Sequence, residues 1–229
     1  MFGCTPKHVS SQVVRKHHVV RRLAVAALFV AAASALSAQS KLSDPSQLTE
    51  AAPDVYRARF DTSKGAFVIE VNRAWAPLGA DRFYNLVKNG FYDGTRFFRV
   101  RPGFVAQWGL NGDPAVQSVW RRANLQDDPR VKSNSRGFVT FAKESLPHTR
   151  STQIFINYAD NDHLDAEGFV PFGQVVSGMQ IAERFFAPPR DREPDQRRIL
   201  TQGNEYLEKE FPQLDFVKKA TIVPAPAAR

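Results

Sequence analysis

The chain has 229 residues, 43% hydrophobic and 24% charged, so it can bury a sizeable core and does not have the composition of a disordered protein. Its formal net charge is +8, but residues 1–38 hold five basic and no acidic residues, which leaves 26 basic and 23 acidic residues in the remainder. That balance argues against a nucleic-acid partner, which needs a basic patch on the folded domain.

The first expected element is an export signal at residues 1–38. A basic stretch precedes the apolar run Leu23–Leu36, and small residues follow as far as Ala38. We place the cleavage after Ala38 or after Ala35 and expect a periplasmic or secreted protein with no stable membrane insertion once the signal is removed. An apolar run of this length is too short to span a bilayer comfortably. The alternative is an N-terminal helix buried in the fold.

The only cysteine, Cys4, lies inside this expected signal. The mature chain would therefore have no thiol, which excludes disulfides, thiolate metal sites and cysteine nucleophiles.

Residues 39–54 are polar and contain prolines, and they read as a linker. Two runs with alternating apolar residues follow, 55–60 and 66–71, and the Gly-containing turn between them predicts a β-hairpin. Pro77 then begins a helical pattern that Gly90 ends.

Short strands are expected further along the chain, at 95–100, 104–107, 137–142, 153–158 and 170–176. A second short helix is expected at 178–186. An insertion at about 187–215 follows, with a helix at 198–211, and a last strand at 216–223 precedes the tail 224–229. Many short strands with few helices indicate an antiparallel barrel or sandwich, and periodicity alone does not choose between them.

Searches for motifs of other chemistries are negative. There is no phosphate-binding loop with Lys-Ser/Thr, no G-x-S-x-G nucleophile elbow and no H-E-x-x-H zinc motif. The acidic run 160–168 has neither the Gly at the sixth position nor the final Glu of a calcium loop. His148 and His163 are the only histidines after the expected signal. We therefore expect no metal site and no cofactor.

The most informative segment surrounds two arginines. Arg99 and Arg101 flank an apolar position in strand-like sequence, so both side chains lie on one side of the strand. Taken alone, Arg99 reads as an ordinary solvated surface arginine. Its interpretation depends on the neighbouring segments.

Those segments resemble the cyclophilin family in order, spacing and residue type. The resemblance runs from Tyr56 to Met179, and the strand near 219–223 can be fitted after the insertion. The matching motifs are F-F-R-x-x-P-G-F-x-x-Q at 97–107, G-F-V-T-F-A at 137–142, Q-I-F-I at 153–156, L-D with F-V-P-F-G at 164–173, and the helical segment that ends in N-G-F-Y-D-G-T at 89–95.

The resemblance implies a mainly β fold, namely a closed eight-stranded antiparallel β-barrel capped by two helices, with an extra helical insertion before the last strand. It places a peptidyl-prolyl cis-trans isomerase domain at 55–223, acting on proline-containing polypeptides among exported proteins. Arg99 corresponds to the catalytic residue. The implied substrate-binding residues are Phe104, Val105, Gln107, Ala142, Lys143, Gln153, Phe155, His163, Leu164 and Phe169.

The physical chemistry of the reaction suits these residue types. The cis and trans forms of an X-Pro bond differ by about 1 kcal/mol, but amide resonance keeps them apart by a barrier of ~20 kcal/mol. When the bond is twisted, the proline nitrogen regains a lone pair and can accept a hydrogen bond. A guanidinium offers fixed charged donors without any proton transfer, and an apolar pocket strengthens that contact.

The sequence also departs from the resemblance. His163 falls where eukaryotic members have the tryptophan that binds cyclosporin, and Val105 falls where many have methionine, so we expect weak cyclosporin binding. The alternative function is a cyclophilin-like proline-peptide binding or chaperone module with little turnover. A third possibility is an unrelated ligand-binding β-barrel.

Overall fold

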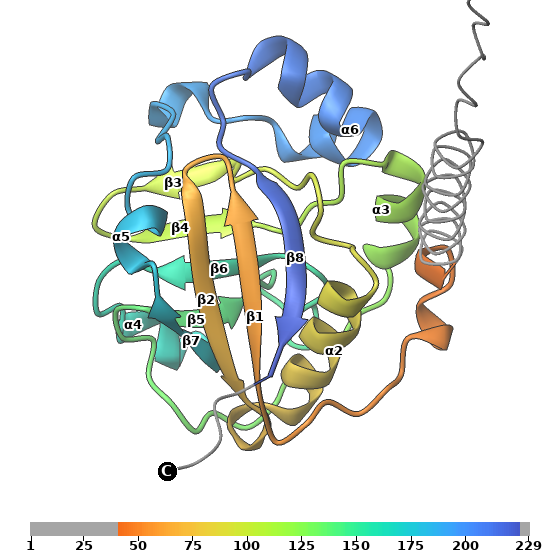
Figure 1. Cartoon of the computed structure of the whole chain (residues 1–229), viewed down its shortest axis with the longest axis vertical. Helices are drawn as coiled ribbons and strands as arrows, with labels where there is room; N and C mark the ends of the chain where they lie inside the picture. Colours follow the sequence, from red (N-terminus) through yellow and green to blue (C-terminus); the bar gives the residue numbers. More distant parts are fainter. Residues whose placement is uncertain (1–40, 225–229) are drawn as a thin grey trace, which may run out of the picture. The chain divides into compact units, whose positions relative to one another are not determined.

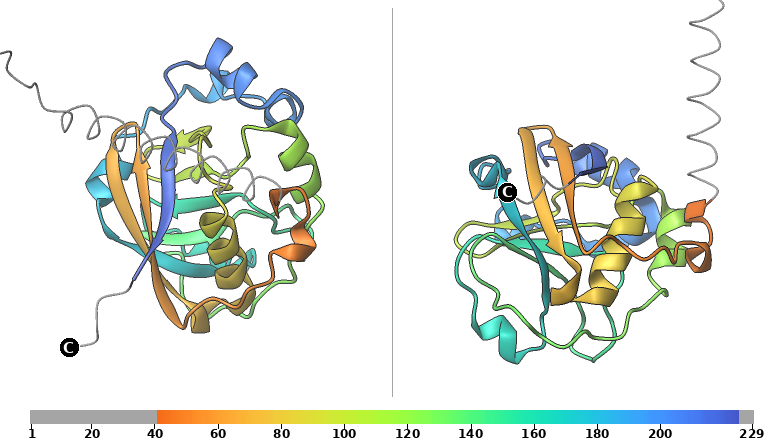
Figure 2. Two further views of the ribbon diagram at one scale, coloured as in Figure 1. Left: turned by 45° about the vertical axis from the view of Figure 1, so that its right-hand side comes forward. Right: turned by 60° about the horizontal axis from the view of Figure 1, so that its bottom comes forward.

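The computed structural model describes residues 41–224, and its centre is a single antiparallel sheet (Figure 1). The strands are β1 (Val55–Thr62), β2 (Gly65–Asn72), β3 (Arg99–Arg101), β4 (Val105–Trp108), β5 (Phe138–Phe141), β6 (Ile154–Asn157), β7 (Pro171–Ser177) and β8 (Val217–Val223). They lie in the order β3-β4-β6-β5-β7-β2-β1-β8. The sheet curls into a half-barrel around the core, as the two views of Figure 2 show.

The described part of the chain also contains five α-helices and three 3₁₀ turns. The helices are α2 (Pro77–Lys88), α3 (Pro114–Trp120), α4 (His163–Ala166), α5 (Met179–Ala182) and α6 (Gln196–Glu210). The turns are η1 (Pro45–Gln47), η2 (Arg73–Trp75) and η3 (Arg190–Arg192). The fold is therefore mainly β, as the sequence predicted.

The expected hairpin is formed by β1 and β2. Their register pairs Thr62 with Gly65, so a two-residue turn joins the strands, and both strands are longer than the apolar runs suggested. Alternate residues point into the core. Phe60 and Phe67 are register partners, fully buried and stacked, with ring centroids 5.1 Å apart. This period-2 alternation is why the sequence was sufficient to predict the hairpin.

Helix α2 supplies the other main part of the core. Pro77 occupies its first turn, and Phe83 is fully buried 6.0 Å from Phe60 between ring centroids. Ala76 at the N-cap has no side chain that could cap the helix. Asp128 caps it instead from a distant loop, accepting hydrogen bonds from Leu78 N (2.9 Å) and Gly79 N (3.0 Å).

The expected closed barrel is wrong, because the sheet is open between its edge strands β3 and β8. The two edges meet only where the segment 94–97, ahead of β3, lies beside residues 215–217 at the start of β8. There Arg96 and Phe216 form an isolated bridge, and Phe97 N donates to Asp215 O at 2.9 Å. No ladder continues from this point: β3 has only three residues, and Arg101 at its far end binds Glu193 of the insertion through its side chain.

The second capping helix, expected at 178–186, is a single turn, α5, followed by turns and coil. Tertiary contacts take the chain out of the helix after Ala182. Phe185 stacks on Phe97 with ring centroids 3.9 Å apart, and Phe186 N donates to Asp215 at 2.7 Å. Helices α3 and α4 were not predicted, since seven and four residues are too few for a clear period.

The insertion does contain the expected helix, as α6. The helix is interrupted at Gly203, whose φ of 60° and ψ of −141° are not helical. A Cβ there would lie 2.1 Å from Gly112 O, so only glycine allows this approach, and it brings Asn204 N to Gly112 O at 3.0 Å. On its buried side, α6 contributes to a second apolar cluster, which consists of Phe98, Leu110, Ile199, Tyr206, Leu207 and Leu214.

The expected linker at 39–54 is described from residue 41 onward. Leu42, Leu48 and Ala52 are buried there, and Trp120 donates its indole N–H to Leu42 O at 2.8 Å. The expected signal at 1–38 and almost all of the tail lie outside the described residues. Within residues 41–224, no helix is long and apolar enough to cross a membrane.

The cap of α2 generates a stability prediction. The Arg150 side chain is fully buried and bonds to Asp128 at 3.0 Å, so Asp128→Ala removes both a helix cap and a partner of a buried charge. We expect a loss of roughly 2–4 kcal/mol in the free energy of unfolding, measured by urea titration. Asp61→Ala, which breaks an exposed ion pair with Arg59, is the control and should cost under about 1 kcal/mol. Equal effects would contradict the proposed role of Asp128.

Candidate functional site

The site begins with the two arginines of β3. Val100 is buried in the core, so the strand alternation places Arg99 and Arg101 on the opposite, outer face, as the sequence predicted. Arg99 is half-buried, whereas Arg101 forms a two-point ion pair with Glu193 of the insertion at 2.8 and 3.0 Å. The two arginines therefore have different roles, and Glu193 holds only Arg101.

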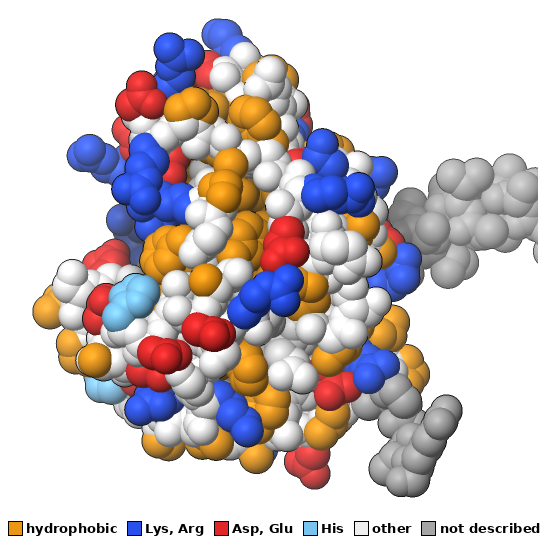
Figure 3. Space-filling model, turned by 90° about the vertical axis from the view of Figure 1, so that its left-hand side faces the viewer, with side chains coloured by type: hydrophobic (Ala, Val, Ile, Leu, Met, Phe, Trp, Pro, Cys, Tyr) orange, Lys and Arg blue, Asp and Glu red, His pale blue; other side chains and the backbone are white. Residues whose placement is uncertain are grey.

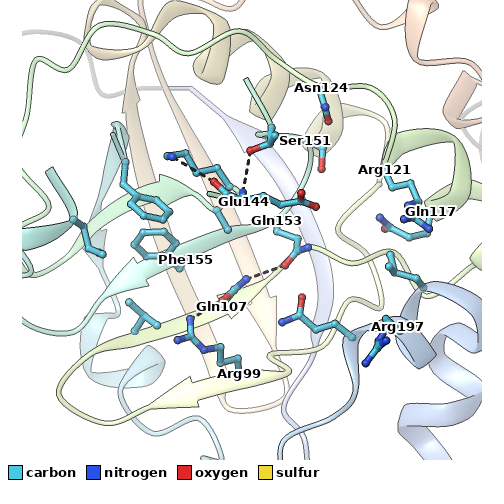
Figure 4. Close-up of a pocket in the computed structure, with 18 of the residues that line it drawn as sticks. Arg99, Gln107, Gln117, Arg121, Asn124, Glu144, Ser151, Gln153, Phe155 and Arg197 are labelled. Atoms are coloured by element: carbon cyan, nitrogen blue, oxygen red, sulfur yellow. Dashed lines mark hydrogen bonds between the residues drawn. The ribbon is translucent and has the colours of Figure 1, made fainter. Parts of the chain in front are cut away.

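A row of polar side chains orients Arg99. Arg99 Nη1 donates to Gln107 Oε1 at 3.0 Å, and Gln107 Nε2 donates to Gln153 Oε1 at 2.8 Å (Figure 4). Arg99 and Gln107 are register partners in β3 and β4, so the sheet sets their spacing. The row fixes one edge of the guanidinium and leaves other N–H donors of Arg99 free for a ligand.

An apolar pocket lies beside this row. Val105, Phe155 and Leu164 are buried together, and Phe104, Ala142 and Phe169 pack against them. Phe155 and Phe169 meet edge to face, with ring centroids 5.8 Å apart and planes at 72°. The residues come from β4, β6 and α4 and from the segments beside them, so the fold assembles one pocket from distant parts of the chain.

The remaining two predicted residues lie at the edges of the pocket. Lys143 extends over Phe169, with Nζ 5.3 Å from the ring centroid. His163 is exposed and stacks on Phe104, with ring centroids 6.0 Å apart, but it does not line the cavity. The structure thus brings all the predicted site residues except His163 to one cavity.

The surroundings of Arg99 disfavour its charged form. Burial lowers the pKa of Arg99, and the nearby charges of Arg101 and Arg190 lower it further, while Glu193 opposes them. A guanidinium remains protonated at neutral pH in spite of such shifts. The result is a cation with incomplete solvation, 5.6 Å from the ring of Phe104 and beside an apolar pocket.

The cavity is larger than the predicted site. It has a volume of about 570 Å³, within the range that holds a drug-sized ligand and more than one pyrrolidine ring needs. The lining residues that sequence reasoning missed are Gln117, Arg121, Asn124, Glu144, Thr149, Ser151, Gln196, Arg197 and Leu200. They come from α3, the loop after β5 and α6, which no single motif joins.

The chemistry available at this site is binding and electrostatic stabilisation. A half-buried guanidinium can donate to a developing lone pair, and the apolar pocket can hold a ring next to it. Among residues 41–224, no group of three or more His, Cys, Asp and Glu side chains could hold a metal ion.

Comparison with known proteins places these features in one family. The family model described as cyclophilin type peptidyl-prolyl cis-trans isomerase/CLD matches residues 57–203. A peptidyl-prolyl cis-trans isomerase of Acinetobacter baylyi is 33% identical over 132 residues, covering 56% of this chain and 70% of that protein. Peptidyl-prolyl cis-trans isomerase B of Escherichia coli is 30% identical over 132 residues, covering 55% and 80%.

Solved structures share the fold. A cyclophilin type peptidyl-prolyl cis-trans isomerase of Cryptosporidium parvum superposes with a TM-score of 0.57 at 21% identity, over 75% of this chain and 99% of that one. A second structure of that protein, in the presence of the dipeptide Ala-Pro, has a TM-score of 0.55 at 21% identity, over 74% and 99%.

Proposed function

The chain belongs to the cyclophilin-type peptidyl-prolyl cis-trans isomerases and is an enzyme of that class, and we propose that Arg99 is its catalytic residue. The observation that carries this proposal is the position of Arg99, half-buried between an apolar pocket and a polar row that orients its guanidinium. A proline ring in the pocket would bring its nitrogen within reach of the free N–H donors of Arg99.

The proposed mechanism is selective stabilisation of the twisted amide. In a planar X-Pro bond the nitrogen lone pair is held in resonance, so the nitrogen cannot accept a hydrogen bond from Arg99, whereas the nitrogen of the twisted bond can. Gln107 prevents the guanidinium from turning away, and Phe155 and Leu164 hold the ring in a medium that strengthens the contact. A rate gain of about five decades requires about 7 kcal/mol, the sum of one charge-assisted hydrogen bond and differential binding.

The proposed substrates are proline-containing polypeptides. A pocket of aromatic and aliphatic side chains fits the pyrrolidine ring, and the structural neighbour from Cryptosporidium parvum was solved in the presence of Ala-Pro. We further propose that these substrates are exported proteins, on the basis of the basic and apolar pattern of residues 1–38.

The catalytic role of Arg99 is tested by substitution. Arg99→Ala should lower kcat/KM for an X-Pro peptide at least tenfold, because the donor to the proline nitrogen is lost. Arg99→Lys should recover little of the loss, since an ammonium lacks the fixed donor geometry. The assay couples isomerisation to chymotrypsin cleavage, and Arg59→Ala, an exposed arginine of β1, is the control. Wild-type rates in both Arg99 variants would refute the mechanism, and peptide binding without turnover in the wild type would favour a binding module.

Export is tested on the native protein. Signal cleavage should leave a mature chain that begins near Leu36 or Gln39 in the periplasm or medium, which N-terminal sequencing of the purified protein measures. A soluble cytoplasmic protein that retains residues 1–35 would show that this segment is not an export signal.

We also propose that the protein binds cyclosporin weakly. By the family resemblance, His163 falls where sensitive members have the indole that binds the drug; in the structure it stacks on Phe104 and does not line the cavity. Loss of one hydrogen bond and some ring contact should cost about 1–3 kcal/mol, or about ten- to a hundredfold in affinity, and Val105 contributes fewer contacting atoms than methionine.

Titration of the isomerase activity with cyclosporin tests this. His163→Trp should bind the drug measurably more tightly than the wild type, while its rate on a short peptide serves as the folding control. Nanomolar inhibition of the wild type would overturn the prediction.

A further inference from the structure

The cavity continues beyond the proline pocket. In Figure 4, Phe155 lies on one side of Gln107 and Gln153, whereas Arg121 and Arg197 lie on the other side. The far portion, which we term the distal compartment, is lined by Arg121 at the C-cap of α3, Glu144 of the loop after β5, and Gln196, Arg197 and Leu200 of α6. None of these residues is needed to hold the proline ring or to orient Arg99.

The insertion forms a fixed wall of the distal compartment. Glu193, just ahead of α6, holds Arg101 of β3 by two short bonds, with side chains only 17% and 26% exposed. Ile199 is buried in the second apolar cluster. Arg197 and Leu200 face the cavity from a helix that is packed at both its start and its buried side, so their backbone positions are set before a ligand arrives.

The two arginines of this compartment are available to a ligand. Arg197 has one acidic neighbour, Asp195, at 3.9 Å, and the Arg197 side chain is 93% exposed. Arg121 is exposed and forms no ion pair within residues 41–224. Glu144, the one acid that lines the cavity, offsets part of the charge. Figure 3 shows Lys and Arg side chains over the upper part of the molecule, where β3 and the insertion lie, with Asp and Glu side chains among them.

The cavity lining contains more basic than acidic side chains. Four basic residues line it, Arg99, Arg121, Lys143 and Arg197, against Glu144 alone. Arg99 serves the proline and Lys143 lies over Phe169, so Arg121 and Arg197 are the cations left for the flanking residues of a bound peptide. An extended peptide advances about 3.3–3.6 Å per residue, so a chain anchored by its proline passes this compartment within a few residues.

We propose that α3 and α6 make the distal compartment a specificity site that favours proline peptides with an acidic side chain two to four residues from the proline. The inference rests on the isomerase function and goes beyond it, because it assigns a substrate preference to the insertion. The arginines act by charge on a flexible, partly solvated partner. The preference should therefore be moderate and should weaken with salt.

The experiment compares matched peptides by two-dimensional exchange NMR, which needs no coupling protease. Each pair carries Glu or Gln at one position, from four residues before the proline to four residues after it. For at least one position two to four residues away, kcat/KM should be about three- to tenfold higher for the Glu peptide at low salt. The ratio should approach one in 1 M NaCl.

Charge-reversal variants test whether Arg121 and Arg197 cause the preference for acidic peptides. Arg197→Glu and Arg121→Glu should each lower the Glu-to-Gln ratio to one or below, and the ratio corrects for a general loss of activity. Arg122→Glu is the matched control, because it changes a neighbouring exposed arginine that does not line the cavity, and it should leave the ratio unchanged.

The outcomes distinguish a failure of the proposed specificity site from a failure of the isomerase function on which it rests. Equal rates for Glu and Gln peptides at every position, or a ratio that survives both reversals, would overturn the specificity site and leave the isomerase intact. A wild-type protein that accelerates none of the peptides would refute the isomerase function itself.

Discussion

The register of four adjacent strands is the constraint on which the site depends. Arg99 pairs with Gln107, Gln107 pairs with Phe155, and Phe155 pairs with Thr140, so one row crosses β3, β4, β6 and β5. The next row consists of Val100, Ala106, Ile156 and Val139, all buried in the core. A slip of one residue in β3 would exchange the two rows in that strand and bury the arginine. The burial of the apolar row therefore holds the polar row in its geometry.

This coupling explains how a short strand can hold the arginine that we propose to be catalytic. β3 has three residues and an edge that the sheet does not close. Its position is secured by Val100 in the core on one side and by Arg101 bound to Glu193 on the other. Arg99, next to these two anchors, donates a hydrogen bond to Gln107 and lies over the ring of Phe104, which leaves it oriented and still able to donate.

The insertion packs at the open edge of the sheet. It meets the sheet where β3 and β8 fail to pair, contributes to a second apolar cluster with Phe98, and presents the exposed part of α6 to the cavity. A surface decoration would need only the first two contacts. The third makes the insertion part of the cavity wall, which is the basis of the substrate selection that we propose.

The sequence by itself determined the elements whose signals are local. The hairpin follows from period-2 alternation, α2 from Pro77 and its apolar face, and the outward direction of Arg99 from its spacing to Val100. Motif order was enough to select residues that line one cavity, because nearly all of them lie in strands or loops with a distinctive local pattern.

Tertiary structure decided everything that depends on contacts between distant segments. The sheet stays open between β3 and β8, Glu193 binds Arg101 of β3 across 92 residues, and α5 stops where Phe185 stacks on Phe97 and Phe186 N donates to Asp215. Arg121 and Arg197 look like solvated arginines in sequence, and only the packing of α6 places both on one cavity. The sequence shows which side chains are present and how they are spaced along the chain. Which distant residues lie next to each other is decided only by the packing of the fold.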